Sequence, residues 1–130
     1  MATIMVVDDA KVMREMIKTI LVTEKHQVIT ADDGDIALEL ARKQQCDLVL
    51  SDINMPKMSG ISLVSKLRRV EGYENTPIIM LTTESSDYKK DKAKKMGANG
   101  WLQKPVEPNR LIKAVNTMLA KAGHVLPSRD

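Results

Sequence analysis

The sequence is poor in aromatic residues and in cysteine, and these shortages exclude several kinds of function. Phenylalanine is absent, whereas methionine occurs nine times, which favours an adaptable apolar core over an aromatic cofactor box. The lone Cys46 cannot form an internal disulfide and has no second thiol for a metal site, so we expect a buried structural thiol. Because the chain lacks an aromatic platform for stacking and any recognisable DNA-binding module, we expect no nucleic-acid partner.

Long apolar runs are also missing. No window approaches the roughly 18 apolar residues of a membrane span, and the N-terminus lacks a basic leader followed by an apolar stretch. The chain contains no internal repeat, low-complexity tract or linker. These absences predict a cytoplasmic protein that does not contact a membrane.

The length of 130 residues and the hydrophobic content of 43% fit one globular domain with a sizeable core. We expect this domain to occupy residues 1–122 and a C-terminal tail to occupy residues 123–130. The formal net charge is only +3, and much of the excess lies between Tyr88 and Met96. We interpret that segment as a solvated helix face or as a docking face for an acidic protein.

Short apolar runs alternate with segments of helical periodicity along the chain. The first helical segment carries Val12, Ile17 and Leu21 at helical spacing, and the second carries Ile36 and Ala37 on one face. Five strands alternating with five helices predict an α/β fold, a doubly wound parallel sheet with the flavodoxin-like strand order 2-1-3-4-5. The expected strands are residues 4–7, 27–31, 47–51, 77–81 and 99–103.

Polar side chains stand where four of these strands end. Asp8 and Asp9 follow the first strand, Asp52 the third, Thr82 the fourth and Lys104 the fifth. The carboxyl ends of parallel strands meet at one edge of a sheet, so we expect the five side chains to converge on one crevice, with Asp52 exposed at its strand end. The alternative interpretation is that the acids and the threonine only cap helices and that the lysine is a surface charge.

The predicted crevice has the residues for phosphoryl transfer. Three neighbouring carboxylates repel one another unless a cation compensates, and Lys104 supplies only one charge. Magnesium prefers oxygen ligands and binds alongside substrate phosphate, so we expect Mg²⁺ as the cofactor. A carboxylate attacks phosphorus without prior deprotonation, which makes Asp52 a candidate nucleophile that would form an aspartyl phosphate.

Four motifs contain these residues. They are Val6-Val7-Asp8-Asp9, Ser51-Asp52-Ile53-Asn54-Met55-Pro56-Lys57-Met58-Ser59-Gly60, Leu81-Thr82-Thr83 and Lys104-Pro105. In this combination, over about residues 3–121, the chain resembles a receiver domain of the bacterial two-component response regulators, most closely the stand-alone chemotaxis (CheY-like) type.

This resemblance implies a role for each residue. Asp52 is the implied phosphoacceptor, and the implied Mg²⁺ ligands are Asp9, Asp8 through water, Asp52 and the backbone carbonyl of Asn54. Thr82 is expected to bond a phosphoryl oxygen and Lys104 to pair with the phosphate, across a cis bond to Pro105.

Other positions are expected to tune the switch. Asn54 and Glu84 are the pair found in chemotaxis regulators and imply rapid loss of the phosphoryl group. Trp101 stands where the family usually has Tyr or Phe as a switch residue. Ala10 stands where an aromatic residue is common, which widens the expected mouth of the site. Ser59 replaces a frequent Asp and can cap the next helix instead.

The resemblance implies a monomeric signalling switch that catalyses only its own phosphorylation and dephosphorylation and is otherwise not an enzyme. The implied partners are a histidine kinase, a target such as the flagellar motor switch, and a phosphatase. The alternatives are a phosphorelay intermediate or phosphate sink, a phosphatase with an Asp nucleophile, and a flavodoxin-like flavin binder. The phosphatase is disfavoured because Asn54 stands where a second acid is needed, two residues after Asp52.

Overall fold

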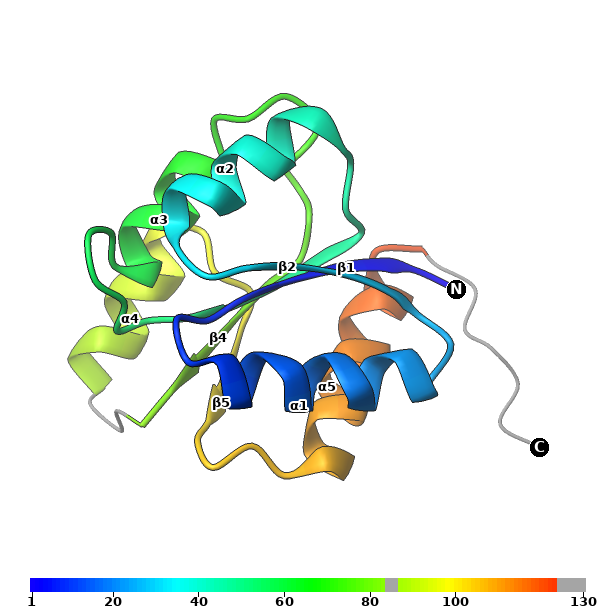
Figure 1. Ribbon diagram of the computed structural model, residues 1–130. Coiled ribbons are helices and arrows are strands. Elements are labelled where there is room, and N and C mark those ends of the chain that lie inside the picture. Colours follow the sequence, from blue (N-terminus) through cyan, green and yellow to red (C-terminus); the bar gives the residue numbers. More distant parts are fainter. Residues whose placement is uncertain (84–86, 124–130) are drawn as a thin grey trace.

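The computed structural model describes residues 1–83 and 87–123 and contains five strands that alternate with five helices (Figure 1). The strands are β1 (Thr3–Val7), β2 (Gln27–Ala31), β3 (Leu48–Asp52), β4 (Ile78–Thr82) and β5 (Gly100–Gln103). The helices are α1 (Lys11–Thr23), α2 (Gly34–Lys43), α3 (Gly60–Leu67), α4 (Asp87–Met96) and α5 (Pro108–Lys121).

All neighbouring strands pair in parallel, in the order β2-β1-β3-β4-β5, which confirms the predicted doubly wound topology. Helices α1 and α5 cover one face of the sheet, and α2, α3 and α4 cover the other (Figure 1). Successive strand residues point to opposite faces. Met5 and Val49 therefore pack under α2, α3 and α4, whereas Ile4 and Leu50 pack under α1 and α5.

Strands β3 and β4 each begin and end one residue later than predicted. The parallel ladder includes the pair Asp52 and Leu81 and the pair Thr82 and Gln103. Asp52 and Thr82 are consequently held by strand pairing, which fixes their backbone more firmly than a loop would.

Two apolar residues were assigned to the wrong helix face. Val12 is 85% exposed because it precedes the buried Ile17 by five residues, which places it about 140° away around a helix of 100° per residue. Ile36 is 40% exposed because Ala37, Leu38 and Ala41 occupy the buried stripe of α2. The prediction for Cys46 is confirmed, since its thiol is fully buried.

Several local predictions are also confirmed. Ser59 caps α3, as predicted, by accepting a hydrogen bond from the backbone N–H of Ser62, and Asp33 caps α2 in the same way through the N–H of Ile36. The peptide bond between Lys104 and Pro105 is cis. Within residues 1–83 and 87–123, every helix is too short or too polar to cross a lipid bilayer.

Candidate functional site

The carboxyl ends of four adjacent strands bring the predicted site residues to one edge of the sheet. Asp8 follows β1, Asp52 ends β3, Thr82 ends β4 and Lys104 follows β5. The backbone N–H of Lys104 donates to the carbonyl oxygen of Thr82 at 2.8 Å, which places the lysine directly beside the end of β4. Residues nearly 100 positions apart in the sequence therefore meet because of the strand order.

Three aspartates form a carboxylate cluster at this edge. Asp8, Asp9 and Asp52 each offer one oxygen, and these oxygens all lie within 4.8 Å of one another. Asp8 and Asp52 are buried, whereas Asp9 is exposed at the mouth. The cluster thus opens to solvent on the side of Asp9.

Lys104 is the cation of the cluster. Its Nζ lies 3.0 Å from Oδ2 of Asp8 and 3.4 Å from Oδ1 of Asp52, and its side chain is only 13% exposed. The interpretation of Lys104 as a surface charge is therefore wrong. A largely buried ammonium between two buried carboxylates is a specific electrostatic arrangement and not a solvated contact.

Asp52 is buried, with a side chain 9% exposed, so the prediction of an exposed carboxylate is wrong. Its neighbours account for this burial, because Lys104 and Asp8 from adjacent strand ends lie beside the carboxylate and the backbone of Asn54 donates a hydrogen bond to it. The pKa of Asp52 is raised, and burial is the main cause. The charge of Asp8 also raises this pKa, whereas the charge of Lys104 and hydrogen bonds from Lys104 and the Asn54 backbone lower it. The carboxylate therefore needs cationic neighbours to stay ionised.

Gly60 explains how α3 approaches the site so closely. A Cβ built at this residue would lie 2.1 Å from the backbone oxygen of Asp52 and 2.8 Å from Cα of Ile53. The N–H of Gly60 also donates to the carbonyl oxygen of Ile53 at 2.7 Å. This contact could not be predicted from the sequence, in which Gly60 is only the last residue of a motif, because backbone approach distances leave no periodic pattern.

The loop after β1 is stabilised by two hydrogen bonds. Oδ1 of Asp8 accepts from the backbone N–H of Ala10 at 2.9 Å, and the Arg14 guanidinium donates to the carbonyl oxygen of Asp8 at 2.8 Å. Ala10 is the N-cap of α1, and no side chain caps that helix. Asp8 thus orders the loop without capping α1, which contradicts the capping alternative for this residue, while its second oxygen contacts Lys104.

The residues expected to tune the switch have three different outcomes. Asn54 is exposed in the loop two residues after Asp52. Trp101 lies half-buried in β5, with Nζ of Lys90 5.5 Å from its ring centroid. Its buried Nε1 has no hydrogen-bond partner within the described part of the chain. Glu84 lies outside the described residues.

The carboxylate cluster fits a magnesium ion. It offers only oxygen donors, it is accessible at Asp9, and its two buried carboxylates share a single close cation. Mg²⁺ typically takes one or two protein carboxylates and keeps several waters, and an open cluster of this kind allows both.

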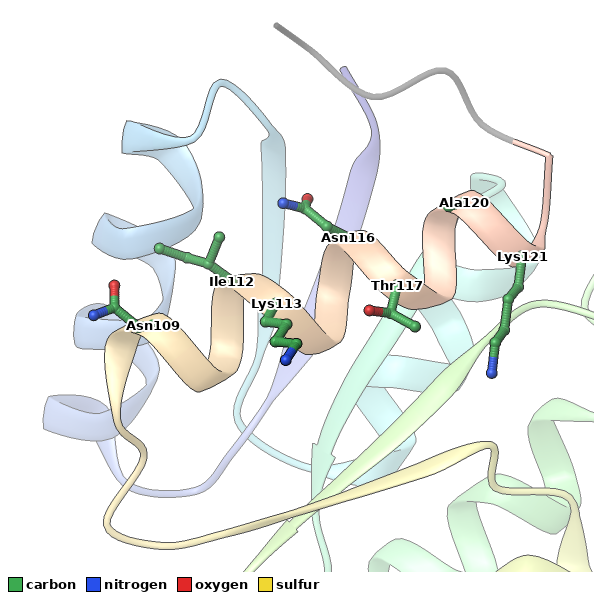
Figure 2. Close-up of a pocket in the computed structure, with 7 residues that line it drawn as sticks. All are labelled: Asn109, Ile112, Lys113, Asn116, Thr117, Ala120 and Lys121. Carbon is green, nitrogen blue, oxygen red and sulfur yellow. The ribbon is translucent and has the colours of Figure 1, made fainter. Parts of the chain in front are cut away.

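A separate pocket lies on the outer surface of α5. It has a volume of about 550 Å³, and all seven residues drawn in Figure 2 belong to that helix. None of them belongs to the site residues predicted from the sequence. This pocket is therefore distinct from the carboxylate cluster.

Residues 4–116 match the family model described as the response regulator receiver domain. The chain is 37% identical to Protein PilH of Pseudomonas aeruginosa over 122 residues, which cover 92% of this chain and 99% of that protein.

Solved structures agree with this match. The chemotaxis protein CheY4 of Vibrio cholerae superposes with a TM-score of 0.89 at 42% identity, covering 91% of this chain and 98% of the other. The receiver domain of the sensor histidine kinase PA1611 of P. aeruginosa superposes with a TM-score of 0.85 at 26% identity. The superposition covers 92% of this chain and 98% of that domain. That structure holds a magnesium ion in its active-site cleft. By sequence, fold and strand-end residues, the chain belongs to the response regulator receiver domain family.

Proposed function

We propose that this receiver domain is a signalling switch in which Asp52 accepts a phosphoryl group from a histidine kinase. One observation carries the proposal: a buried Asp52 carboxylate lies at a strand end with two further aspartates within 4.8 Å and the Lys104 ammonium at 3.4 Å. A carboxylate in such surroundings is oriented, partly desolvated and beside a cation that can pair with a phosphoryl oxygen.

The transfer step balances without an acid or base from this chain. An oxygen of the Asp52 carboxylate forms a bond to phosphorus as the P–N bond to the kinase histidine breaks. The electron pair of the broken bond returns to the imidazole nitrogen. Hydrolysis ends the signal when water attacks the phosphorus and the Asp52 carboxylate leaves.

Other residues have supporting roles in the proposal. Asp9, Asp52 and the Asn54 carbonyl are the proposed direct ligands of Mg²⁺, and Asp8 is a proposed ligand through water. When bound, the ion would neutralise charge on the phosphoryl oxygens. Lys104 is proposed to pair with a phosphoryl oxygen, and the hydroxyl of Thr82 to bond another. Glu84 and Asn54 are proposed to set the hydrolysis rate.

The output is proposed to be a protein-binding surface formed by α4, β5 and α5, in a domain occupying residues 1–122. The added phosphoryl charge would draw Thr82 and the loop after β4 towards Asp52 and so shift α4. Trp101 and the lysines Lys89, Lys92 and Lys95 belong to this surface. The likeness to the chemotaxis protein CheY4 supports a chemotaxis target, such as the flagellar motor switch, reached in the cytoplasm.

The test is to incubate the protein with Mg²⁺ and a small acyl-phosphate donor and to follow intact mass and Trp101 fluorescence. We expect a mass gain of one phosphoryl group in the wild type and none in Asp52→Asn. Asp32→Asn is the matched control, because Asp32 is an exposed carboxylate that follows the edge strand β2. An adduct that persists in Asp52→Asn and disappears in Asp32→Asn contradicts the proposal.

The lifetime of the adduct separates the switch from a phosphorelay intermediate. A switch that resembles chemotaxis regulators should lose its phosphoryl group quickly, whereas a relay must hold it until the next histidine arrives. Mixing the phosphorylated protein with a histidine phosphotransfer protein gives the second measurement. Transfer from Asp52 to that histidine at a rate above hydrolysis favours the relay.

A further inference from the structure

A basic pocket lies at the other end of the sheet from Asp52, between the C-terminal ends of α2 and α3. Its volume is about 790 Å³, and it is lined by Arg42, Gln45, Lys66, Arg69, Val70, Glu71 and Gly72. The lining belongs to the segments that lead into β3 and β4. Since Asp52 ends β3, the five residues of that strand separate the two sites by about 16 Å.

Three cations dominate the basic pocket. The side chains of Arg42, Lys66 and Arg69 are exposed, and none forms an ion pair or hydrogen bond in the described part of the chain. A cation in the last turn of a helix offsets the negative end of the helix dipole, which accounts for Arg42 and Lys66. Arg69 lies beyond the end of α3 and is not explained in this way.

The backbone that continues from the lining of the basic pocket towards β4 is held by hydrogen bonds. The Arg68 guanidinium donates to the carbonyl oxygens of Tyr73 and Thr76, both at 2.7 Å. Buried Tyr73 accepts a hydrogen bond from the N–H of Cys46 at 2.9 Å, which ties the segment before β4 to the segment before β3. The unpaired cations therefore project from a backbone that is already ordered, so binding costs little backbone entropy.

We infer that the basic pocket is a docking surface for an acidic segment of a partner protein. Two guanidinium groups and one ammonium suit carboxylates, because arginine binds them in a bidentate manner. A protein is favoured over a single-stranded nucleic acid because no aromatic side chain that could stack on bases lines the pocket. Glu71 also belongs to the lining. A protein segment can offer Glu71 a basic residue.

The distance of the basic pocket from Asp52 separates binding at the pocket from phosphorylation. The elements that would respond to phosphorylation, α4 and the loop after β4, contribute no residue to the basic pocket. Binding there is therefore independent of the phosphorylation state, and the inference stands whether or not the proposed phosphorylation occurs.

The test uses the full chain and an octaglutamate peptide as the probe. Fluorescence anisotropy of the labelled peptide gives the affinity, and amide shifts of the ¹⁵N-labelled protein locate the contact. We expect shifts at Val70 and Gly72, and a loss of affinity of about tenfold or more in the double variant Arg42→Glu/Arg69→Glu. Lys18→Glu/Lys25→Glu is the matched control, because it makes the same charge change on α1 and just after it, and α1 covers the opposite face of the sheet from α2 and α3 (Figure 1).

Three results would overturn the inference. The first is equal weakening by the two double variants, which would mean that the peptide senses only the net charge. The second is tighter binding of an eight-nucleotide single-stranded DNA to the same residues. The third is a clear change in affinity after treatment with the acyl-phosphate donor, whereas an unchanged affinity in Asp52→Asn and in the treated protein supports it. Thermal unfolding of each variant verifies that it is folded.

Discussion

At the scale of single residues, Lys104 decides the charge balance of the candidate site. Its ammonium contacts two buried carboxylates at 3.0 and 3.4 Å, and so it occupies part of the space in which a metal and a phosphoryl group would meet. One positive charge can therefore oppose the binding of a divalent cation and still assist the transfer of a phosphoryl group.

Replacing Lys104 should separate these two effects. In Lys104→Met we expect Mg²⁺ to bind about tenfold more tightly, because a unit positive charge beside the carboxylates is removed. Phosphorylation by the acyl-phosphate donor should slow by about tenfold or more, because a phosphoryl oxygen loses its cation. Calorimetric Mg²⁺ titration and intact mass measure the two effects. Lys57→Met is the control, and weaker Mg²⁺ binding in Lys104→Met would contradict this account.

His26 should make the stability of the fold depend on pH. Its buried Nδ1 accepts a hydrogen bond from the N–H of Ala2 at 3.2 Å, which requires an unprotonated nitrogen. Burial lowers the pKa of His26 below 6.5, the N-terminal charge lowers it further, and Glu24 opposes the shift. The unfolded chain then binds the proton more readily, so stability rises with pH and is lost as the pH falls below about 6.5.

The measurement is the free energy of unfolding in urea between about pH 7.5 and about pH 5.5. We expect a smaller decrease with falling pH in His26→Gln than in the wild type. His124→Gln removes the chain's other histidine and serves as the control. Equal pH slopes for the wild type and His26→Gln would show that His26 is not responsible.

At the scale of elements, Arg68 joins the ends of α3 and α4. Its guanidinium donates to the carbonyl oxygens of Tyr73, Thr76 and Gly97 and to Oδ1 of Asn99, at 2.7 to 3.2 Å. Burial lowers the pKa of this guanidinium. One side chain thus holds the C-terminal end of α4 while the other end of that helix is available to respond to the site.

Removing this contact should destabilise the protein. In Arg68→Ala we expect the free energy of unfolding to fall by about 3 kcal/mol or more, because several carbonyl groups lose a charged donor. Arg69→Ala is a matched control, since the neighbouring arginine has no partner among the described residues and should change stability by less than about 0.5 kcal/mol. Urea unfolding measures both variants, and similar losses would contradict the role given to Arg68.

Arg68 also shows where prediction from sequence ends. Asp8, Asp52 and Lys104 were predictable because each stands out as a polar residue after an apolar strand, and strand order then brings them together. Arg68 binds mainly backbone carbonyl oxygens, which no residue pattern reveals. The burial of Asp52 was missed for a related reason, since it depends on how closely Lys104 and Asp8 from neighbouring strand ends approach the carboxylate.

At the scale of the whole molecule, the alternation of strands and helices was sufficient to predict the sheet and its order. Connections in α/β proteins are right-handed and short, so few topologies are compatible with five such units. The helix faces were predicted less well, as Val12 and Ile36 show, because an apolar residue can lie outside the face of a helix that packs on the sheet.

The proposed domain boundary can be tested by shortening the chain. Helix α5 ends at Lys121, and Leu119 is its last buried residue. We expect residues 1–122 alone to unfold with a free energy within about 0.5 kcal/mol of the full chain. The control, residues 1–114, lacks Val115 and Leu119, each worth about 2–5 kcal/mol when buried, and should fail to fold. A large loss in residues 1–122 would place the boundary further along the chain.

The ion pair between Asp8 and Lys104 joins residues 96 positions apart. During synthesis, the first carboxylate leaves the ribosome long before the lysine that balances it is made. An unfinished chain therefore carries Asp8 and Asp52 without their common cation and without β5 beside β4. Chains that terminate before Lys104 should therefore have no signalling activity. They should compete with the full chain neither for the kinase's phosphoryl group nor for the target.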